Sequence, residues 1–240
     1  ELNLIDANTL QNRLLGNVYA ELNIFDFLSY RFNAGADVLF GESKTFTPVY
    51  ELGGRSNPRA TINEGRLSEN IFLLEHTLTF NPTLSNDHDL SILVGYSQQD
   101  ALIRNIGGGV QDFPNNDTRT INAGFGQSNI SGGESEWALR SILARVNYSF
   151  KDKYLLMATV RRDGSSRFGS DRRYGTFPSF SAGWRIGDEP FMNNVDFISD
   201  MKLRLSWGQV GNQEIPPYAS YATIEPVARY IFGLNQGLVK

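Results

Sequence analysis

Strict alternation of apolar and polar residues along short segments is the feature that most constrains this chain. Residues 154–186 show it most clearly, because two alternating segments flank a polar loop rich in Gly and Arg. A period of two places alternate side chains on opposite faces of a β-strand. The apolar side chains are Tyr154, Leu156, Ala158 and Val160 on the first segment, and Phe180, Ala182, Trp184 and Ile186 on the second. The chain is therefore predicted to form sheets with one apolar and one polar face.

The lengths of the connections follow a rhythm along eight alternating segments. Short or medium connections are predicted at 25–27, 81–89, 151–153 and 187–200, and long loops at 39–71, 98–140 and 163–178. Weaker strand patterns occur at 218–224 and 227–233. In successive antiparallel strands, this order puts every short turn at one end and every long loop at the other. Outer-membrane β-barrels have this layout. The predicted fold is all-β: an antiparallel, up-and-down transmembrane β-barrel segment of about eight to ten strands.

Composition narrows the possible functions. The chain has no Cys, which excludes a disulfide framework, a thiolate metal site and a thiol nucleophile. Its net charge of −4 disfavours nucleic acid as a partner. No window is apolar enough for a transmembrane helix, but barrel strands escape that test because their hydrophobicity only alternates.

The two faces lead to two readings. If the apolar face meets lipid, the polar face lines a lumen, and its cationic residues are candidate substrate-binding residues. These candidates are Arg31, Arg145, Arg161, Arg185 and Arg204. Small residues among large ones on the apolar face favour this reading: Ala20, Ala34, Ala144, Ala158 and Ala182. The alternative is a soluble β-sandwich that binds carbohydrate or serves a structural role, with the same cations on a solvated face.

Catalytic motifs give a third, weaker alternative. Asp163 with Asp171, or Asp188 with Glu189, could form a glycosidase carboxylate pair, but each lies in a turn-like setting that favours Asp for local reasons. His76 and His88 lack the spacing of a zinc site. We therefore expect no enzyme, no cofactor and no metal. The Arg-rich loop 161–173 could bind an anionic ligand, but the favoured interpretation is internal pairing of Asp163 and Asp171 with Arg162, Arg167, Arg172 or Arg173.

Aromatic residues gather at both ends of the strands, which favours the two girdles of a membrane barrel over the alternative that aromatics simply prefer strand ends and cores. At the short-turn ends they are Phe25, Phe27, Phe80, Tyr148, Phe150 and Tyr154, and near the long loops they are Phe168, Phe177, Phe180 and Trp207.

Several runs of residues resemble a known family. They are Lys153–Leu156, Arg161–Gly169, Phe177–Ser179, Ser181–Arg185, Ser199–Arg204 and Gly211–Gln213. They are similar to the corresponding runs of the SusC/RagA family of TonB-dependent outer-membrane transporters. The resemblance implies a single domain, 1–240, that is a slice of a barrel of about 22 strands.

The resemblance also implies a function. Members of that family import oligosaccharides, peptides or similar solutes across the outer membrane of Bacteroidetes-type bacteria. Their partners are a SusD-like surface lipoprotein and TonB. We expect this chain to lack the signal peptide, the TonB box, the plug and the last strands of a whole member. The long loops 39–71 and 98–140 are expected to contact the substrate or the lipoprotein lid.

Overall fold

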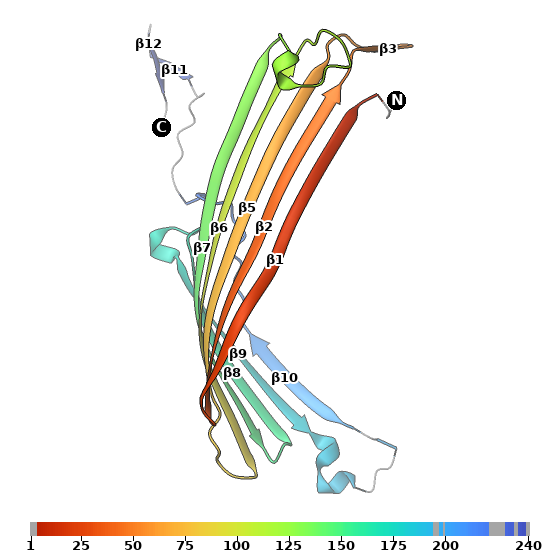
Figure 1. The fold of residues 1–240 in the computed structure, drawn as a ribbon. Coiled ribbons are helices and arrows are strands. Elements are labelled where there is room, and N and C mark those ends of the chain that lie inside the picture. Colours follow the sequence, from red (N-terminus) through yellow and green to blue (C-terminus); the bar gives the residue numbers. More distant parts are fainter. Residues whose placement is uncertain (1–3, 194–196, 199, 221–228, 233–234, 239–240) are drawn as a thin grey trace.

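The computed structural model is organised around one curved antiparallel sheet of eight strands (Figure 1). It describes residues 4–193, 197–198, 200–220, 229–232 and 235–238. The sheet contains β1 (Asp6–Phe25), β2 (Leu28–Thr47), β5 (Thr61–Phe80), β6 (His88–Gln111), β7 (Ser128–Phe150), β8 (Tyr154–Ser165), β9 (Tyr174–Arg185) and β10 (Lys202–Gly208). Each strand pairs with the strands before and after it in the sheet's chain order. The predicted up-and-down topology is confirmed, and in this chain the sheet is open.

Smaller elements decorate the ends of the sheet. They are the hairpins β3 (Tyr50–Leu52)–β4 (Arg55–Asn57) and β11 (Arg229–Phe232)–β12 (Asn235–Leu238), and the 3₁₀ turns η1 (Ile121–Ala123), η2 (Ser170–Arg172), η3 (Ile186–Asp188) and η4 (Pro190–Met192). Among the described residues, no helix is long and apolar enough to cross a membrane. β11 falls within the predicted strand 227–233. Residues 218–220 form a turn rather than the strand predicted at 218–224, whose remainder lies outside the described residues.

The connection between β7 and β8 shows how local residues fix a short turn. Lys151 and Asp152 both have positive φ, 51° and 54°, and the Lys153 N–H donates to the Phe150 carbonyl. This is the geometry of a primed turn, whose twist matches that of the flanking strands. It sets the register in which Phe150 pairs with Tyr154.

Strand length divides the sheet into two regions. β1, β2 and β5 have 20 residues each, β6 has 24 and β7 has 23, whereas β8 and β9 have 12 and β10 has 7. We call β1, β2, β5, β6 and β7 the long strands, and β8, β9 and β10 the short strands. The predicted loops 39–71 and 98–140 are therefore wrong in extent: strand pairing continues through most of both, and only 48–60 and 112–127 lie outside the main sheet.

The only buried apolar cluster among the described residues lies at the loop end of the long strands. Phe46, Ala60, Ile62, Val110 and Phe113 pack together there, and the rings of Phe46 and Phe113 meet edge to face. This cluster ties loops 48–60 and 112–127 to the tops of β2, β5 and β6. Elsewhere in the described part of the chain, the faces of the sheet enclose no such cluster.

Candidate functional site

The strand register assigns each side chain to one face, because directly paired residues project to the same side of a sheet. One cross-strand row runs from Arg31 through Thr77, Gly95 and Leu143 to Arg161. The remaining candidates follow by the same rule from the pairing of β7 with β8, β8 with β9, and β9 with β10. All five predicted arginines share this face, which we call the arginine face: Arg31, Arg145, Arg161, Arg185 and Arg204.

The five arginines form two close sets and one separate residue. Arg145 and Arg161 are diagonal neighbours on β7 and β8, since Arg145 pairs with Thr159. Arg185 and Arg204 are diagonal neighbours on β9 and β10, towards the short-turn end. Arg31 lies on β2, so the row separates it from Arg161 by the width of three intervening strands.

The local contacts of these arginines differ. The Arg161 Nε donates to Asp163 at 2.6 Å and its Nη2 donates to Ser141 at 3.0 Å, so Arg161 is fixed. Arg145 makes one long contact, 3.4 Å from its Nε to the Thr159 hydroxyl. The Arg31 guanidinium lies 4.3 Å from the centre of the Tyr19 ring. All five arginines are exposed residues, so each guanidinium retains donors for a polar solute.

The interpretation of loop 161–173 as internally paired holds in part. Asp163 pairs with Arg161 rather than with a later arginine. Arg167 pairs with Glu214 in the tail instead, at 3.3 Å, and also lies over the Trp137 ring. Asp171 accepts a hydrogen bond from the hydroxyl of Ser170.

A polar network on β1, β2 and β5 was not predicted from the sequence. Arg13 Nε donates to Asp37 at 2.7 Å, while Asn33 accepts from Asn17 at 3.0 Å and donates to Glu75 at 2.9 Å. These residues lie on the arginine face. Arg13 and Asn17 alternate with the apolar residues of β1. Extending the predicted strand upstream to Arg13 would therefore have placed both side chains on this face. Within the described part of the chain, no group of three acidic or His side chains could hold a metal ion.

The opposite face, which we call the apolar face, contains the five predicted alanines, Ala20, Ala34, Ala144, Ala158 and Ala182. Its large side chains are uncovered: Leu14 is 72% exposed, Val18 70% and Leu205 68%. Among the described residues no second sheet packs on it, and so the β-sandwich alternative lacks its facing sheet. A continuous exposed apolar surface of this kind marks a site of contact with a membrane or with another protein.

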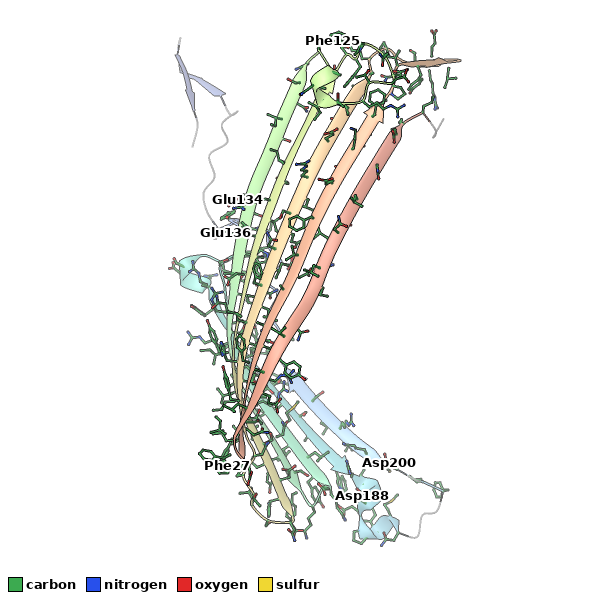
Figure 2. All side chains as sticks on the ribbon, viewed as in Figure 1. Phe27, Phe125, Glu134, Glu136, Asp188 and Asp200 are labelled. Carbon is green, nitrogen blue, oxygen red and sulfur yellow. The ribbon has the colours of Figure 1, made fainter. Side chains whose placement is uncertain are left out.

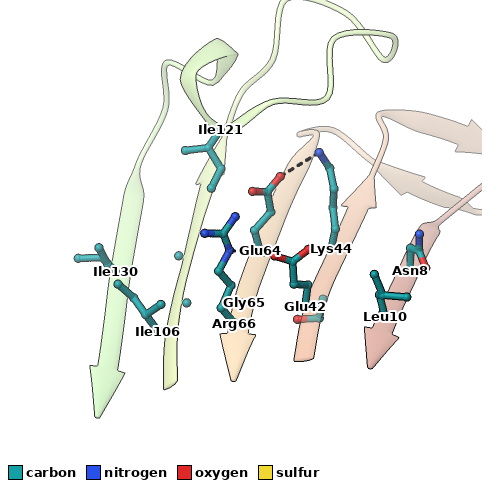
Figure 3. A pocket seen from close by; sticks show the side chains of 13 residues that line it. Asn8, Leu10, Glu42, Lys44, Glu64, Gly65, Arg66, Ile106, Ile121 and Ile130 are labelled. Atoms are coloured by element: carbon teal, nitrogen blue, oxygen red, sulfur yellow. Dashed lines mark ion pairs between the residues drawn. The ribbon is translucent and has the colours of Figure 1, made fainter. Parts of the chain in front are cut away.

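The apolar face changes character along the long strands. Beyond the apolar band, this face carries paired charges among isolated apolar residues. Lys44 pairs with Glu64 at 2.9 Å, and Arg66 pairs with Glu42 at 3.4 Å. Figure 3 shows these side chains in a shallow hollow, between apolar residues of β1, β6 and β7. Because its cations and carboxylates neutralise each other, the hollow offers no obvious charge for a ligand.

Aromatic side chains cluster at the short-turn end, as predicted. Phe27 stacks on Phe25 at 5.3 Å between ring centres and meets Phe80 edge to face at 5.7 Å. Figure 2 places Phe27 there, with Phe125 at the far loop end. At the loop end the grouping differs from the prediction, because Phe177 pairs with Arg161 and so lies on the arginine face.

A carboxylate anchors the turn between β9 and β10. Glu189 accepts hydrogen bonds from the Tyr154 hydroxyl at 2.8 Å and from the Trp184 indole at 3.1 Å. The Lys153 ammonium is 3.7 Å away. Hydrogen bonding from Tyr154, followed by that from Trp184, lowers the pKa of Glu189 below its ordinary value, because these donors stabilise the charged form.

Comparison with known proteins assigns the chain to a protein family. Residues 3–234 match the family model described as "TonB dependent receptor-like, beta-barrel". The chain belongs to the TonB-dependent receptor β-barrel family. It is 32% identical over 214 residues to TonB-dependent receptor P39 of Formosa agariphila, covering 85% of this chain and 20% of that protein. The chain thus spans about a fifth of the length of the curated relatives it matches.

Two further similarities refine this assignment. TonB-dependent receptor SusC of Bacteroides thetaiotaomicron is 46% identical over 99 residues, which is 40% of this chain and 10% of SusC. The structure of the RagAB peptide transporter superposes with a TM-score of 0.88 at 22% identity, covering 99% of this chain and 26% of that one. The chain thus forms a wall segment of a TonB-dependent receptor barrel, a family of the outer membrane, and it has the fold of the matching part of RagAB.

Proposed function

We propose that this segment forms part of a receptor that imports large solutes, oligosaccharides or peptides, across the outer membrane, and that its arginine face lines the lumen. The observation that carries this proposal is the sorting of all five arginines onto the face opposite the apolar band. In a membrane barrel the face opposite lipid borders the interior. Exposed guanidinium groups there donate hydrogen bonds to hydroxyl, carbonyl and carboxylate oxygens.

The partners follow from the same family. A SusD-like lipoprotein would cover the loop end, where loops 48–60 and 112–127 are held by the buried Phe46–Phe113 cluster. TonB would supply energy from the opposite side of the membrane. RagAB, whose fold this chain shares, is a peptide transporter, which makes peptides one substrate class to test. The role of this chain is that of a receptor and transporter wall, with no part in catalysis.

The test uses the complete receptor and the two least constrained arginines. Arg145→Gln with Arg204→Gln removes two lumen cations while leaving the Arg161–Asp163 pair intact. Loss of charge-assisted hydrogen bonds is expected to weaken uptake roughly tenfold or more. Growth on defined oligosaccharide or peptide mixtures as the sole carbon source gives the readout.

The matched control is Arg104→Gln, which removes the same charge on the opposite face, outside the band. It should leave uptake unchanged. If the double variant imports every mixture at the wild-type rate, the arginine face does not contact the solute and the lumen assignment is wrong.

A further inference from the structure

The border of the apolar band crosses the strands of the outer face obliquely, as expected for strands tilted in a membrane. On each strand, an apolar residue is followed towards the loop end by a polar residue on the same face. These steps are Phe72 to Asn70 on β5, Tyr96 to Gln98 on β6, Ile142 to Arg140 on β7 and Val160 to Arg162 on β8. The line they define marks where lipid tails give way to headgroups on the extracellular side.

At this border, the side chain of Arg162 is held by contacts with residues of β8 and β9. Its guanidinium lies 5.2 Å from the centre of the Tyr174 ring, on the neighbouring strand β9. The ring in turn lies over Gly164, where an added Cβ would come within 2.3 Å of a ring carbon. Because Gly164 has no side chain, the Tyr174 ring can pack against its backbone. In this position the ring supports the Arg162 guanidinium. A cation on an aromatic face is held in orientation while its N–H groups remain open at the edge.

The charge of Arg162 is uncompensated, unlike that of its neighbours on the same face. Arg140, one step away, donates to Asp100 at 3.0 Å, and Arg104 is paired with Glu134. Among the described residues, no carboxylate lies within ion-pair distance of Arg162, and its residue is exposed. A lone exposed cation next to an apolar band has a natural counter-ion in an anionic headgroup.

We propose that Arg162, stacked on Tyr174, binds the phosphate of a lipid headgroup in the outer leaflet of the membrane. The planar guanidinium matches two phosphate oxygens, and Val160, Pro178 and Phe180 below it contact the acyl chains of the same lipid. This site is independent of the lumen and of the transported solute. It gives Arg162, Gly164 and Tyr174 a role in positioning the barrel in the bilayer.

The experiment uses the complete receptor, delipidated in detergent and examined by native mass spectrometry. The probe is lipid A carrying two phosphates, with dephosphorylated lipid A as the matched lipid and inorganic phosphate as the lipid-free anion. We expect the receptor to retain the diphosphorylated lipid in preference to the dephosphorylated one. Arg162→Gln should weaken that retention about fivefold. Arg104→Gln, on the same face but outside the border, should leave it within about twofold.

Three results would overturn the proposal. One is equal retention of the two lipids by the wild-type receptor, a comparison that does not depend on any variant folding. Another is unchanged retention of diphosphorylated lipid A by Arg162→Gln. The third is displacement of the lipid by inorganic phosphate at equal concentration, which would assign the site to a free anion.

Discussion

The long and short strands share one sheet but differ in what their outer face meets. On β8 and β9 the apolar band fills most of the 12-residue strand, which is close to the nine to eleven residues or so that a tilted strand needs to cross a bilayer. On β5, β6 and β7 the same band occupies only the part nearest the short turns. The remaining residues extend these strands beyond the band by roughly 30–45 Å.

Strand pairing therefore extends beyond the part of the sheet that crosses the membrane. In the long strands, the backbone ladder continues past the membrane border, but the outer side chains change from alanine, valine and leucine to paired charges. In the short strands, the chain turns almost at the border. The short strands leave the upper edge of β7 beyond Leu139 without β8 as its neighbour, and Figure 2 shows Glu134 and Glu136 along this stretch.

The largest expected effect comes from placing one charge at two heights on the same face of β7. Ala144→Arg puts a cation inside the apolar band and should destabilise the folded receptor by about 2–4 kcal/mol. Ile130→Arg lies outside the band, where Ile130 is already 80% exposed, and should cost at most about 1 kcal/mol. The measurement is the fraction of folded, heat-modifiable receptor in the outer membrane during a urea titration. Equal costs at both positions would abolish the distinction between the two regions.

A second substitution tests whether the long strands carry their own core. Ile62 is fully buried in the loop-end cluster, so Ile62→Ala should cost about 2–4 kcal/mol locally and expose loops 48–60 and 112–127 to protease. Ile106→Ala, on the neighbouring strand and 54% exposed, should cost under about 0.5 kcal/mol. Limited proteolysis of the intact receptor compares them. Protection of both loops in the Ile62 variant would show that the cluster does not hold them.

The short strands are expected to respond to acid through Glu189. Its pKa is lowered in the folded protein, so its contribution is complete above the ordinary value of 4.5 and disappears as the pH falls through the folded pKa. Glu189→Gln should therefore lower the unfolding temperature at neutral pH, and the gap to wild type should narrow below pH 4.5. Asp188→Asn, half exposed, serves as the control. A gap that widens on acidification would reverse the assigned sign.

The smallest expected effect concerns the paired charges beyond the band. Arg104→Gln removes the exposed Arg104–Glu134 pair and should lower the free energy of unfolding only slightly, and less at high salt, because solvent and ions screen the pair. Urea titrations at two salt concentrations measure it. A cost as large as that of Ala144→Arg would mean that these charges are buried against another surface.

The sequence predicted the band but not the height of the long strands, for a physical reason. Alternation is visible only where one face is apolar, as at Ile142, Ala144 and Val146. In 128–140 and 98–111 apolar residues are scattered over both faces among polar residues and glycines, so no period of two is visible, although the backbone pairs as it does in the band. The arginine face was predicted because its residues lie within the band. The Arg13–Asp37 pair and the Tyr174 seat on Gly164 depend on register and close packing, which residue spacing does not reveal.

The central claim is that one face of this wall meets lipid up to the border and water beyond it. Because the chain contains no Cys, single Cys residues can be placed along β7 at positions 130, 134, 144 and 146 and spin-labelled in the complete receptor. Collision rates with oxygen and with a water-soluble nickel complex then report depth. Labels at 144 and 146 should favour oxygen, and labels at 130 and 134 should favour nickel. A label at 144 that is as accessible to nickel as one at 130 would contradict the account.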